Sequence, residues 1–377
     1  MKLGLILSND WEVFGDGSGD FFNIQYEPTE QLLDVCQNHD AKLTLMAEVG
    51  YYWAHERHQD AVPGAGEILA AWREQVRNAV ARGHDAQLHL HPQWLAARYA
   101  DGRWRLDFSR WSLSALPYEE QKTHLDRGRA LLEGIGKPAR ASYRCLAYRA
   151  GGYAMEPPQD IVRALAASGI LADSSVRKKD RMNAAHGSYD YRSAYSWAVP
   201  WYVDERDMNR PQQSGQKKLL LEIPIYGEAG WSPWRQIKRR LFCPSSERLH
   251  QQQRRVKDAP ASSPDLIEAL ERRRQSLFWK IWTHLTSTTP IFLDYIFVAP
   301  TELTWMLNQL HRRYAEFEGI LPVMSIGHVK NMRSAGDVGV FLEKSKKALG
   351  SELLFWSYQE AVEYLLANPR ILDLPPD

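Results

Sequence analysis

Residues 83–94 read GHDAQLHLHPQW, and they decide how the rest of the chain is interpreted. Residues 85–90 of this stretch predict a short buried strand that ends at two histidines. Side chains two residues apart in a strand lie on the same side of the sheet, so His89 and His91 can reach one metal ion. Taken alone, the pair favours a metal site, although two surface histidines that bind nothing would give the same pattern.

Apolar segments alternate in both directions from this stretch. Before it, we expect strands over residues 3–8 and 42–47 and helices over residues 28–38 and 64–82. This β-α-β-α-β order predicts a parallel sheet with helical crossovers. After it, we expect strands over residues 142–148, 169–174, 219–225, 291–298, 321–327 and 353–356, and helices over residues 118–134, 158–168, 300–317, 338–349 and 358–367. Residues 176–217 and 231–290 are expected to be irregular insertions, the second with a helix over residues 266–286.

Composition limits the class of protein. The chain has 377 residues, of which 44% are hydrophobic and 25% charged, and we expect one folded domain over residues 1–377, a length that suits an α/β barrel with insertions. A net charge of +1 gives no overall field that would attract nucleic acid. Three cysteines are too few for a disulfide framework, which favours a reducing compartment. The first apolar run soon meets Asp10, and no segment is long enough for an integral membrane span, so we expect a cytoplasmic protein.

Reactive side chains stand where the predicted strands end. Each has an ordinary structural explanation by itself, such as a turn cap or a structural ion pair. Their shared position is the face on which barrel enzymes carry out chemistry, so we interpret them as one site. They are Asp10, Glu12, His89, His91, Arg149, Asp173 and His328.

The donor types in this set suit a metal-assisted hydrolysis. Two histidines and one carboxylate leave open positions on a metal for water and substrate. Asp10 and Glu12 are two residues apart, so both can face the metal, and one can bind it while the other takes a proton from water. His328 is the candidate acid that protonates a leaving amine, with Asp173 as the group that orients it.

Three further features would assist the reaction. Arg149 can keep the base carboxylate ionised, and backbone N–H groups at Gly152 and Tyr153 can bind an oxyanion. The loop over residues 92–117 carries Trp94 and other aromatic residues, and a loop at this end of a strand is the usual place for substrate contacts.

These residues resemble the motifs of the polysaccharide deacetylases of carbohydrate esterase family 4. The matching stretches, in chain order, are Asp10-Trp11-Glu12, His89-Leu90-His91, Arg149-Ala150-Gly151-Gly152-Tyr153, Asp173-Ser174-Ser175 and Ile326-Gly327-His328. The resemblance implies an α/β fold, a distorted (β/α) barrel of about seven to eight parallel strands. It also implies a divalent metal, with zinc expected. The base would then be Asp10, braced by Arg149, and the acid would be His328. The metal ligands would be Glu12, His89 and His91.

Two motifs depart from the family pattern. The family has an Asp ligand directly after the base, whereas here Trp11 takes that place and Glu12 follows. The family's two ligand histidines are four residues apart, whereas here His91 comes two residues after His89, and Gln93 stands at the fourth position. The ligand set is therefore the least conventional part of the resemblance.

The resemblance implies a metal-dependent hydrolase that removes an acetyl group from an N-acylated sugar during assembly of a cell-surface polysaccharide. A cytoplasmic location favours a nucleotide-linked or lipid-linked sugar as the substrate. Three alternatives stay open, namely a deformylase on such a sugar, a catalytically inactive barrel that binds sugar, and a metal-free ring-opening amidase. The sequence does not determine the oligomeric state.

Overall fold

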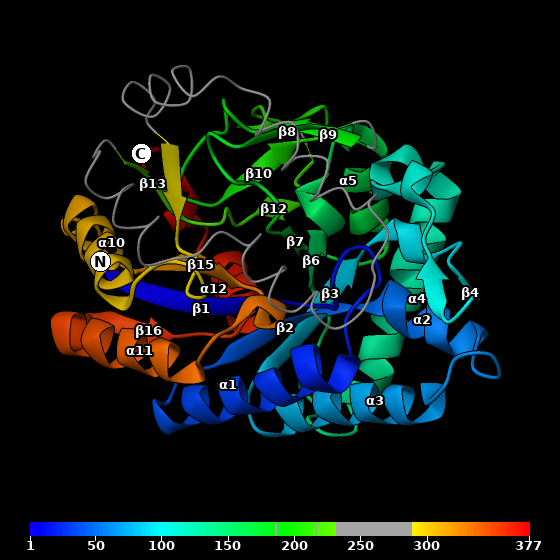
Figure 1. The fold of residues 1–377 in the computed structure, drawn as a ribbon. Coiled ribbons are helices and arrows are strands. Elements are labelled where there is room, and N and C mark those ends of the chain that lie inside the picture. The colour runs from blue at the N-terminus through cyan, green and yellow to red at the C-terminus, as the bar shows by residue number, and fades with distance from the viewer. Residues whose placement is uncertain (185–186, 216, 231–288) are drawn as a thin grey trace, which may run out of the picture.

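Seven parallel strands form the centre of the described part of the chain (Figure 1). The computed structural model describes residues 1–184, 187–215, 217–230 and 289–377. Each of the seven strands pairs in parallel with the next. Their order across the sheet is β15 (Ile320–Gly327), β1 (Lys2–Trp11), β2 (Leu43–Glu48), β3 (Asp85–Leu90), β6 (Ala147–Ala150), β7 (Ala172–Asp173) and β12 (Leu221–Glu222).

The sheet curls until its two ends meet. Ile225, just beyond β12, forms a parallel bridge to Met324 of β15. The N–H of Tyr226 donates to the carbonyl of Met324 at 2.9 Å. A second bridge joins Asp294 to Ile326. The described strands therefore form a distorted (β/α) barrel, as predicted.

Shorter strands extend this barrel. The strand β16 (Leu353–Phe355) pairs in parallel with the first half of β1. Beyond β12, β10 (Trp201–Asp204) and β11 (Asp207–Pro211) add two antiparallel strands. The predicted insertion at residues 176–217 is thus more ordered than expected, because it also contains the hairpin of β8 (Arg181–Ala184) and β9 (Gly187–Asp190).

Helices connect the strands and surround the sheet (Figure 1). Local sequence signals set several of their boundaries. Ser357 and Glu360 form a capping box at the start of α12, and a proline stands in the first turn of α1, α5 and α10. The α-helices of the described ranges are α1 (Glu27–Asn38), α2 (Val49–Arg57), α3 (Ala65–Ala81), α4 (Tyr118–Gly136), α5 (Pro158–Ala167), α10 (Pro300–Arg313), α11 (Ala335–Leu349) and α12 (Tyr358–Ala367).

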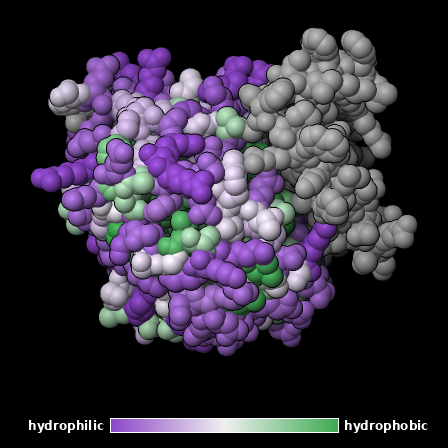
Figure 2. All heavy atoms as spheres, turned by 90° about the vertical axis from the view of Figure 1, so that its left-hand side faces the viewer, coloured by the Kyte–Doolittle hydropathy of each residue, from purple (hydrophilic) through white to green (hydrophobic). Residues whose placement is uncertain are grey.

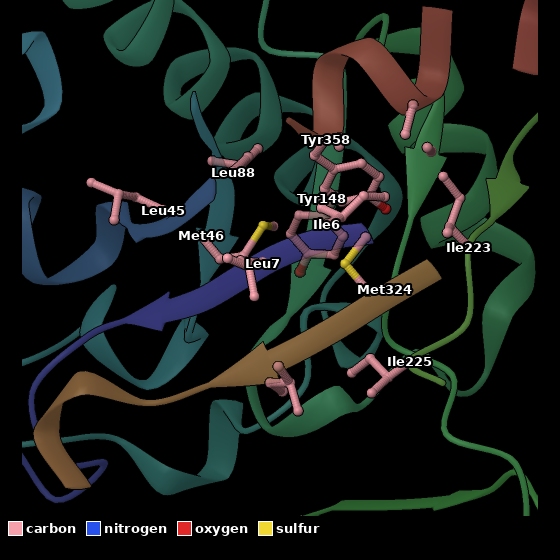
Figure 3. Close-up of a cluster of buried hydrophobic side chains, with 14 of the residues drawn as sticks. Ile6, Leu7, Leu45, Met46, Leu88, Tyr148, Ile223, Ile225, Met324 and Tyr358 are labelled. Carbon is pink, nitrogen blue, oxygen red and sulfur yellow. The ribbon is translucent and has the colours of Figure 1, made fainter. Parts of the chain in front are cut away.

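One apolar core holds the strands in place. Figure 3 shows side chains from separate segments of the chain in this core, among them Ile6, Leu45, Leu88, Ile223 and Met324. All five are fully buried. Burying a side chain of this size contributes about 1.5–3 kcal/mol, so the core stabilises the packing of these segments against one another.

The expected strand over residues 291–298 is mostly absent. Only β14 (Thr289–Phe292) forms, and it pairs antiparallel with β13 (Gly227–Gly230). Asp294 ends it, because its Oδ1 accepts hydrogen bonds from the N–H groups of Ile296 and Phe297. Such local bonds compete with pairing in a sheet. The expected helix over residues 266–286, and nearly all of the second insertion, lie outside the described residues.

Within the loop over residues 92–117, β4 (Arg98–Ala100) and β5 (Arg103–Arg105) form a small hairpin. Figure 2 shows one face of the molecule, which is mainly hydrophilic with small separated hydrophobic patches. None of the helices in the described ranges has the length and apolar character needed to cross a membrane.

Two carboxyl groups lie side by side at the ends of β7 and β12. Asp173 and Glu222 are paired in register and fully buried. Asp173 accepts hydrogen bonds from the N–H and hydroxyl of Ser175 at 3.0 and 2.8 Å, and Glu222 accepts one from the N–H of Val176 at 3.0 Å. Burial and the charge of Asp173 raise the pKa of Glu222 well above its ordinary value. The pair therefore holds a proton and ties the loop after β7 to β12.

We expect the protein to lose stability as the pH rises through the folded-state pKa of Glu222. A group whose pKa is raised by folding stabilises the fold at low pH, and this contribution disappears once the native site loses its proton. Glu222→Gln keeps a donor toward Asp173 without titrating. Its free energy of unfolding, measured by urea denaturation, should therefore decline less than that of the wild type as the pH rises above 4.5, the ordinary value for a glutamate carboxyl. Glu316→Gln, at an exposed position, is the control and should follow the wild type. Equal declines in Glu222→Gln and the wild type would contradict this account.

Candidate metal and acid–base site

The carboxyl ends of the barrel strands meet around one cavity of about 330 Å³. Register places Glu48 of β2 beside His89 of β3, and His89 beside Arg149 of β6. Residues far apart in the sequence therefore share one site. The cavity is lined by Asp10, Glu12, Gly15, His91, Trp111, Gly152, Tyr153, Arg177, Asp180, Arg181, Met182, Tyr189, His328 and Lys330.

Four buried side chains form a group that can hold a metal ion. Glu12, Glu48, His89 and His91 each offer a ligand atom, and these atoms all lie within 4.8 Å of one another. Glu12 Oε2 lies 2.7 Å from His91 Nε2 and 3.5 Å from His89 Nε2. Imidazole nitrogens and carboxylate oxygens are ordinary ligands of divalent metals, so the donor set fits such an ion.

His89 is oriented as a ligand. Its Nδ1 lies 2.8 Å from the carbonyl oxygen of Arg149, and because a carbonyl only accepts, Nδ1 carries the hydrogen. Nε2 is buried and has no hydrogen-bond partner among the described residues. Burial disfavours a charge on this ring, but Glu12 and Asp10 outweigh it and raise the pKa of His89 to about 9. A metal ion would satisfy this nitrogen in place of a proton.

Glu48 is not identified from the sequence, although it stands at the end of a predicted strand just as Asp10 does. Its Oε1 accepts a hydrogen bond from the N–H of Gly50 at 2.7 Å, which caps α2, and its Oε2 accepts one from the N–H of His91 at 2.8 Å. Each oxygen retains a second lone pair that can face an ion. One carboxylate thus starts a helix, positions His91 and belongs to the group that can hold a metal ion.

Lys330 also contacts this group. Its Nζ donates to Glu12 Oε1 at 2.8 Å and to the carbonyl of Val13 at 3.3 Å. Burial opposes a charge on Glu12, but Lys330 and His91 lower the pKa of Glu12 well below its ordinary value. Glu12 is therefore a carboxylate whose Oε2 is directed to the histidines.

Asp10 stands beside the metal group as a second carboxylate. Arg149 Nη1 donates to Asp10 Oδ1 at 2.6 Å, and both residues are buried. Burial opposes ionisation, but Arg149 and His328 lower the pKa of Asp10 well below its ordinary value. Asp10 Oδ2 lies 3.3 Å from His328 Nε2 and accepts a hydrogen bond from the Tyr153 hydroxyl at 3.2 Å. The candidate base therefore faces the candidate acid directly.

Two glycines allow aromatic rings to approach the turn over Gly151–Tyr153. A Cβ added to Gly151 would lie 2.7 Å from Cγ of His91, and one added to Gly152 would lie 2.7 Å from Cζ2 of Trp111. Gly152 has φ 58°, a conformation that glycine adopts readily, and Tyr153 follows with φ 62°. The turn thereby brings the Tyr153 side chain to Asp10.

Most of the predicted site residues lie at this cavity. Arg149 and His89 contact the lining residues Asp10 and Glu12. Those that line the cavity are Asp10, Glu12, His91, Gly152, Tyr153 and His328. Trp94 and Asp173 are not among them.

Trp94 lies instead in a buried aromatic cluster. Its ring centroid is 5.2 Å from that of Tyr51 and 5.4 Å from that of Trp104. The indole that lines the cavity belongs to Trp111, from the same loop. Trp94, expected from this loop, therefore does not line the cavity, whereas Trp111 does.

Asp173 is joined to Ser175 and Glu222, and no hydrogen bond to His328 is present among the described residues. His328 interacts instead with Asp10, at 3.3 Å, and with Asp294, whose pKa is raised by burial despite that interaction. Asp173 was predicted to orient His328, and no direct contact between the two residues supports that role.

No family model matches the sequence, and no curated protein matches it significantly. Among solved structures, the chain is similar to a protein from Mycobacterium smegmatis classed as a polysaccharide deacetylase, with 12% identity, a TM-score of 0.46, and coverage of 100% of this chain and 92% of that one. It is also similar to PuuE allantoinase, with 12% identity, a TM-score of 0.46 and coverage of 97% and 91%. A third similar structure is a 4-alpha-glucanotransferase from Thermococcus litoralis, with 12% identity, a TM-score of 0.43 and coverage of 96% and 40%. Likenesses this distant assign no activity, which has to be argued from the site itself.

We expect the purified protein to bind one divalent ion per chain through this group. Glu48→Gln should weaken zinc affinity by about 10- to 100-fold, because it removes a carboxylate that also positions His91. His89→Ala should abolish stoichiometric binding. Isothermal titration and metal analysis measure both effects, with Glu67→Gln, at an exposed position, as the matched control. A full equivalent of metal in His89→Ala would show that the ligand assignment is wrong.

Proposed function

We propose that this protein is a metal-dependent amidohydrolase that removes an N-acyl group, first of all acetyl, from a sugar. One observation carries the proposal. The buried metal group, which includes Glu12, lies directly beside the pair of Asp10 and His328. Hydrolysis of an amide needs both parts, because the carbonyl must be polarised and the leaving nitrogen must receive a proton.

The residues divide this chemistry between them. A bound divalent ion, with zinc expected, would polarise the acyl carbonyl and acidify a water molecule. Asp10 Oδ2 is the base, since Arg149 holds the other oxygen and keeps the carboxylate ionised. His328 Nε2 lies 3.3 Å from that base oxygen. A proton that Asp10 takes from water can therefore reach the candidate acid in a single transfer.

The cavity walls support a sugar as the substrate. Trp111, Tyr153 and Tyr189 line the cavity, and aromatic faces suit the apolar side of a sugar ring. The volume of about 330 Å³ suits a ligand the size of one sugar unit rather than a polymer.

Basic residues favour a sugar that carries phosphate. Lys330, Arg177 and Arg181 all line the cavity. Lys330 pairs with Glu12 and Arg177 with Asp180, but arginine side chains are the usual partners of phosphate. We therefore favour a nucleotide-linked or lipid-linked sugar, used in the cytoplasm during assembly of a cell-surface polysaccharide. Removal of a formyl group from such a sugar is the second candidate, because it needs the same chemistry in a small cavity.

We expect the metal-loaded protein to release acetate or formate from a panel of N-acylated nucleotide sugars. Chelation should abolish release and added zinc should restore it. His328→Gln should retain the metal but lower kcat by about 100- to 10,000-fold, because the acid side of the site is lost. Coupled assays for acetate and formate distinguish the two acyl groups.

The same experiment separates the alternatives. Glu67→Gln should match the wild type, which controls for purification. Binding of the sugars without acyl release, together with a lack of bound metal, would indicate an inactive sugar-binding barrel. Turnover of cyclic ureides that survives exhaustive chelation would indicate a metal-free ring-opening amidase. Either result would overturn the proposed function.

A further inference from the structure

We infer that the Tyr153 hydroxyl is a catalytic group that delivers the proton to the leaving nitrogen, and that Asp10 restores it. This inference rests on the proposed function and moves the proton donor from His328 to Tyr153, with His328 as the group that stabilises the tyrosine oxygen. The tyrosine was expected to act only through its backbone N–H, so its side chain has no role in the chemistry described so far.

The hydroxyl occupies the junction of the two acid–base residues. It donates to Asp10 Oδ2 at 3.2 Å and lies 3.4 Å from His328 Nε2. Asp10 Oδ1 is held by Arg149 at 2.6 Å, so Oδ2 is the oxygen that can take up a proton from water. Tyr153 therefore contacts the one oxygen atom at which the abstracted proton would reside. It also lines the cavity that would hold the substrate.

The surroundings fix the ring in this position. Arg177 lies over it, with its guanidinium carbon 3.9 Å from the ring centroid. The hydroxyl of Tyr191 donates to the Tyr153 backbone carbonyl at 2.6 Å. Arg177 is itself held by Asp180 and by the Tyr189 hydroxyl. A hydroxyl held in this way needs little reorganisation to act as a donor.

The proton transfers balance within this cluster. Water loses a proton to Asp10 Oδ2 as its oxygen bonds to the acyl carbon. The carbon–nitrogen bond then breaks, and the nitrogen takes the proton from the Tyr153 hydroxyl. The tyrosine oxygen recovers a proton from Asp10 Oδ2, which returns both groups to their initial states. While the tyrosine oxygen is negative, the Arg177 guanidinium over the ring and a hydrogen on His328 Nε2 stabilise it.

Leaving groups that differ in their need for a proton test this role. An amine must be protonated to leave, whereas p-nitrophenolate leaves as the anion. Tyr153→Phe should therefore lower kcat for the N-acetyl sugar by about 100-fold or more and change hydrolysis of p-nitrophenyl acetate by less than about threefold. KM and zinc content should stay at the wild-type values. Tyr202→Phe, on β10 away from the cavity lining, is the matched control.

The outcomes separate this inference from the function on which it rests. Equal losses on the amide and the ester would mean that Tyr153 supports the site without donating the proton. No loss on the amide would also overturn the inference, and in both cases the proposed function would stand. A wild-type protein that hydrolyses neither substrate while fully loaded with zinc would overturn the proposed function and this inference together.

Discussion

The site depends on the hydrogen bonds that the buried guanidinium of Arg149 donates. It donates to Asp10 Oδ1 at 2.6 Å, to the Ser8 hydroxyl at 2.8 Å, and to the carbonyl and hydroxyl of Ser174 at 3.1 and 2.9 Å. These bonds join β1, β6 and the loop after β7 beneath the cavity. A buried charge is stable only when it is satisfied in this way, and removing one partner of such a pair typically costs about 3–5 kcal/mol. The same bonds that hold three strand ends together keep the candidate base ionised.

The arrangement of the strands brings residues that are far apart in the sequence together at the site. Parallel strands place all their carboxyl ends on one face, and the bridge from Ile225 to Met324 draws the two ends of the sheet together. His328 follows β15, which pairs directly with β1 and sets Gly327 opposite Asn9, so His328 lies 3.3 Å from Asp10. The two histidines are only two residues apart on one strand. The neighbouring strand β2 adds Glu48 to their group as a further carboxylate.

Residue order alone predicted much of this arrangement. The strand over residues 85–90 has the predicted bounds, and its flanking Gly83 and Pro92 mark both ends. The rule that reactive groups follow strands located Asp10 and His328, and applied to β2 it would have located Glu48. Glu48 was missed because the aromatic segment after it gave no clear sequence signal for the helix α2. Composition could not separate Trp94 from other tryptophans of its loop, because turns within the loop decide which ring faces the cavity.

Gln93 stands where the polysaccharide deacetylases that these motifs resemble have their second ligand histidine, and here it contacts His91. Its Nε2 lies 3.0 Å from His91 Nδ1, and its Oε1 is buried with no hydrogen-bond partner among the described residues. With Nε2 donating to Nδ1, the hydrogen of His91 is on its own Nε2, toward Glu12 Oε2 at 2.7 Å. If the side-chain amide of Gln93 is flipped, its Oε1 accepts a hydrogen bond from His91 Nδ1–H. The lone pair of His91 Nε2 can then bind a metal. One amide can thus serve both the proton-bound and the metal-binding forms of His91, which a histidine at the same position could not do while acting as a ligand itself.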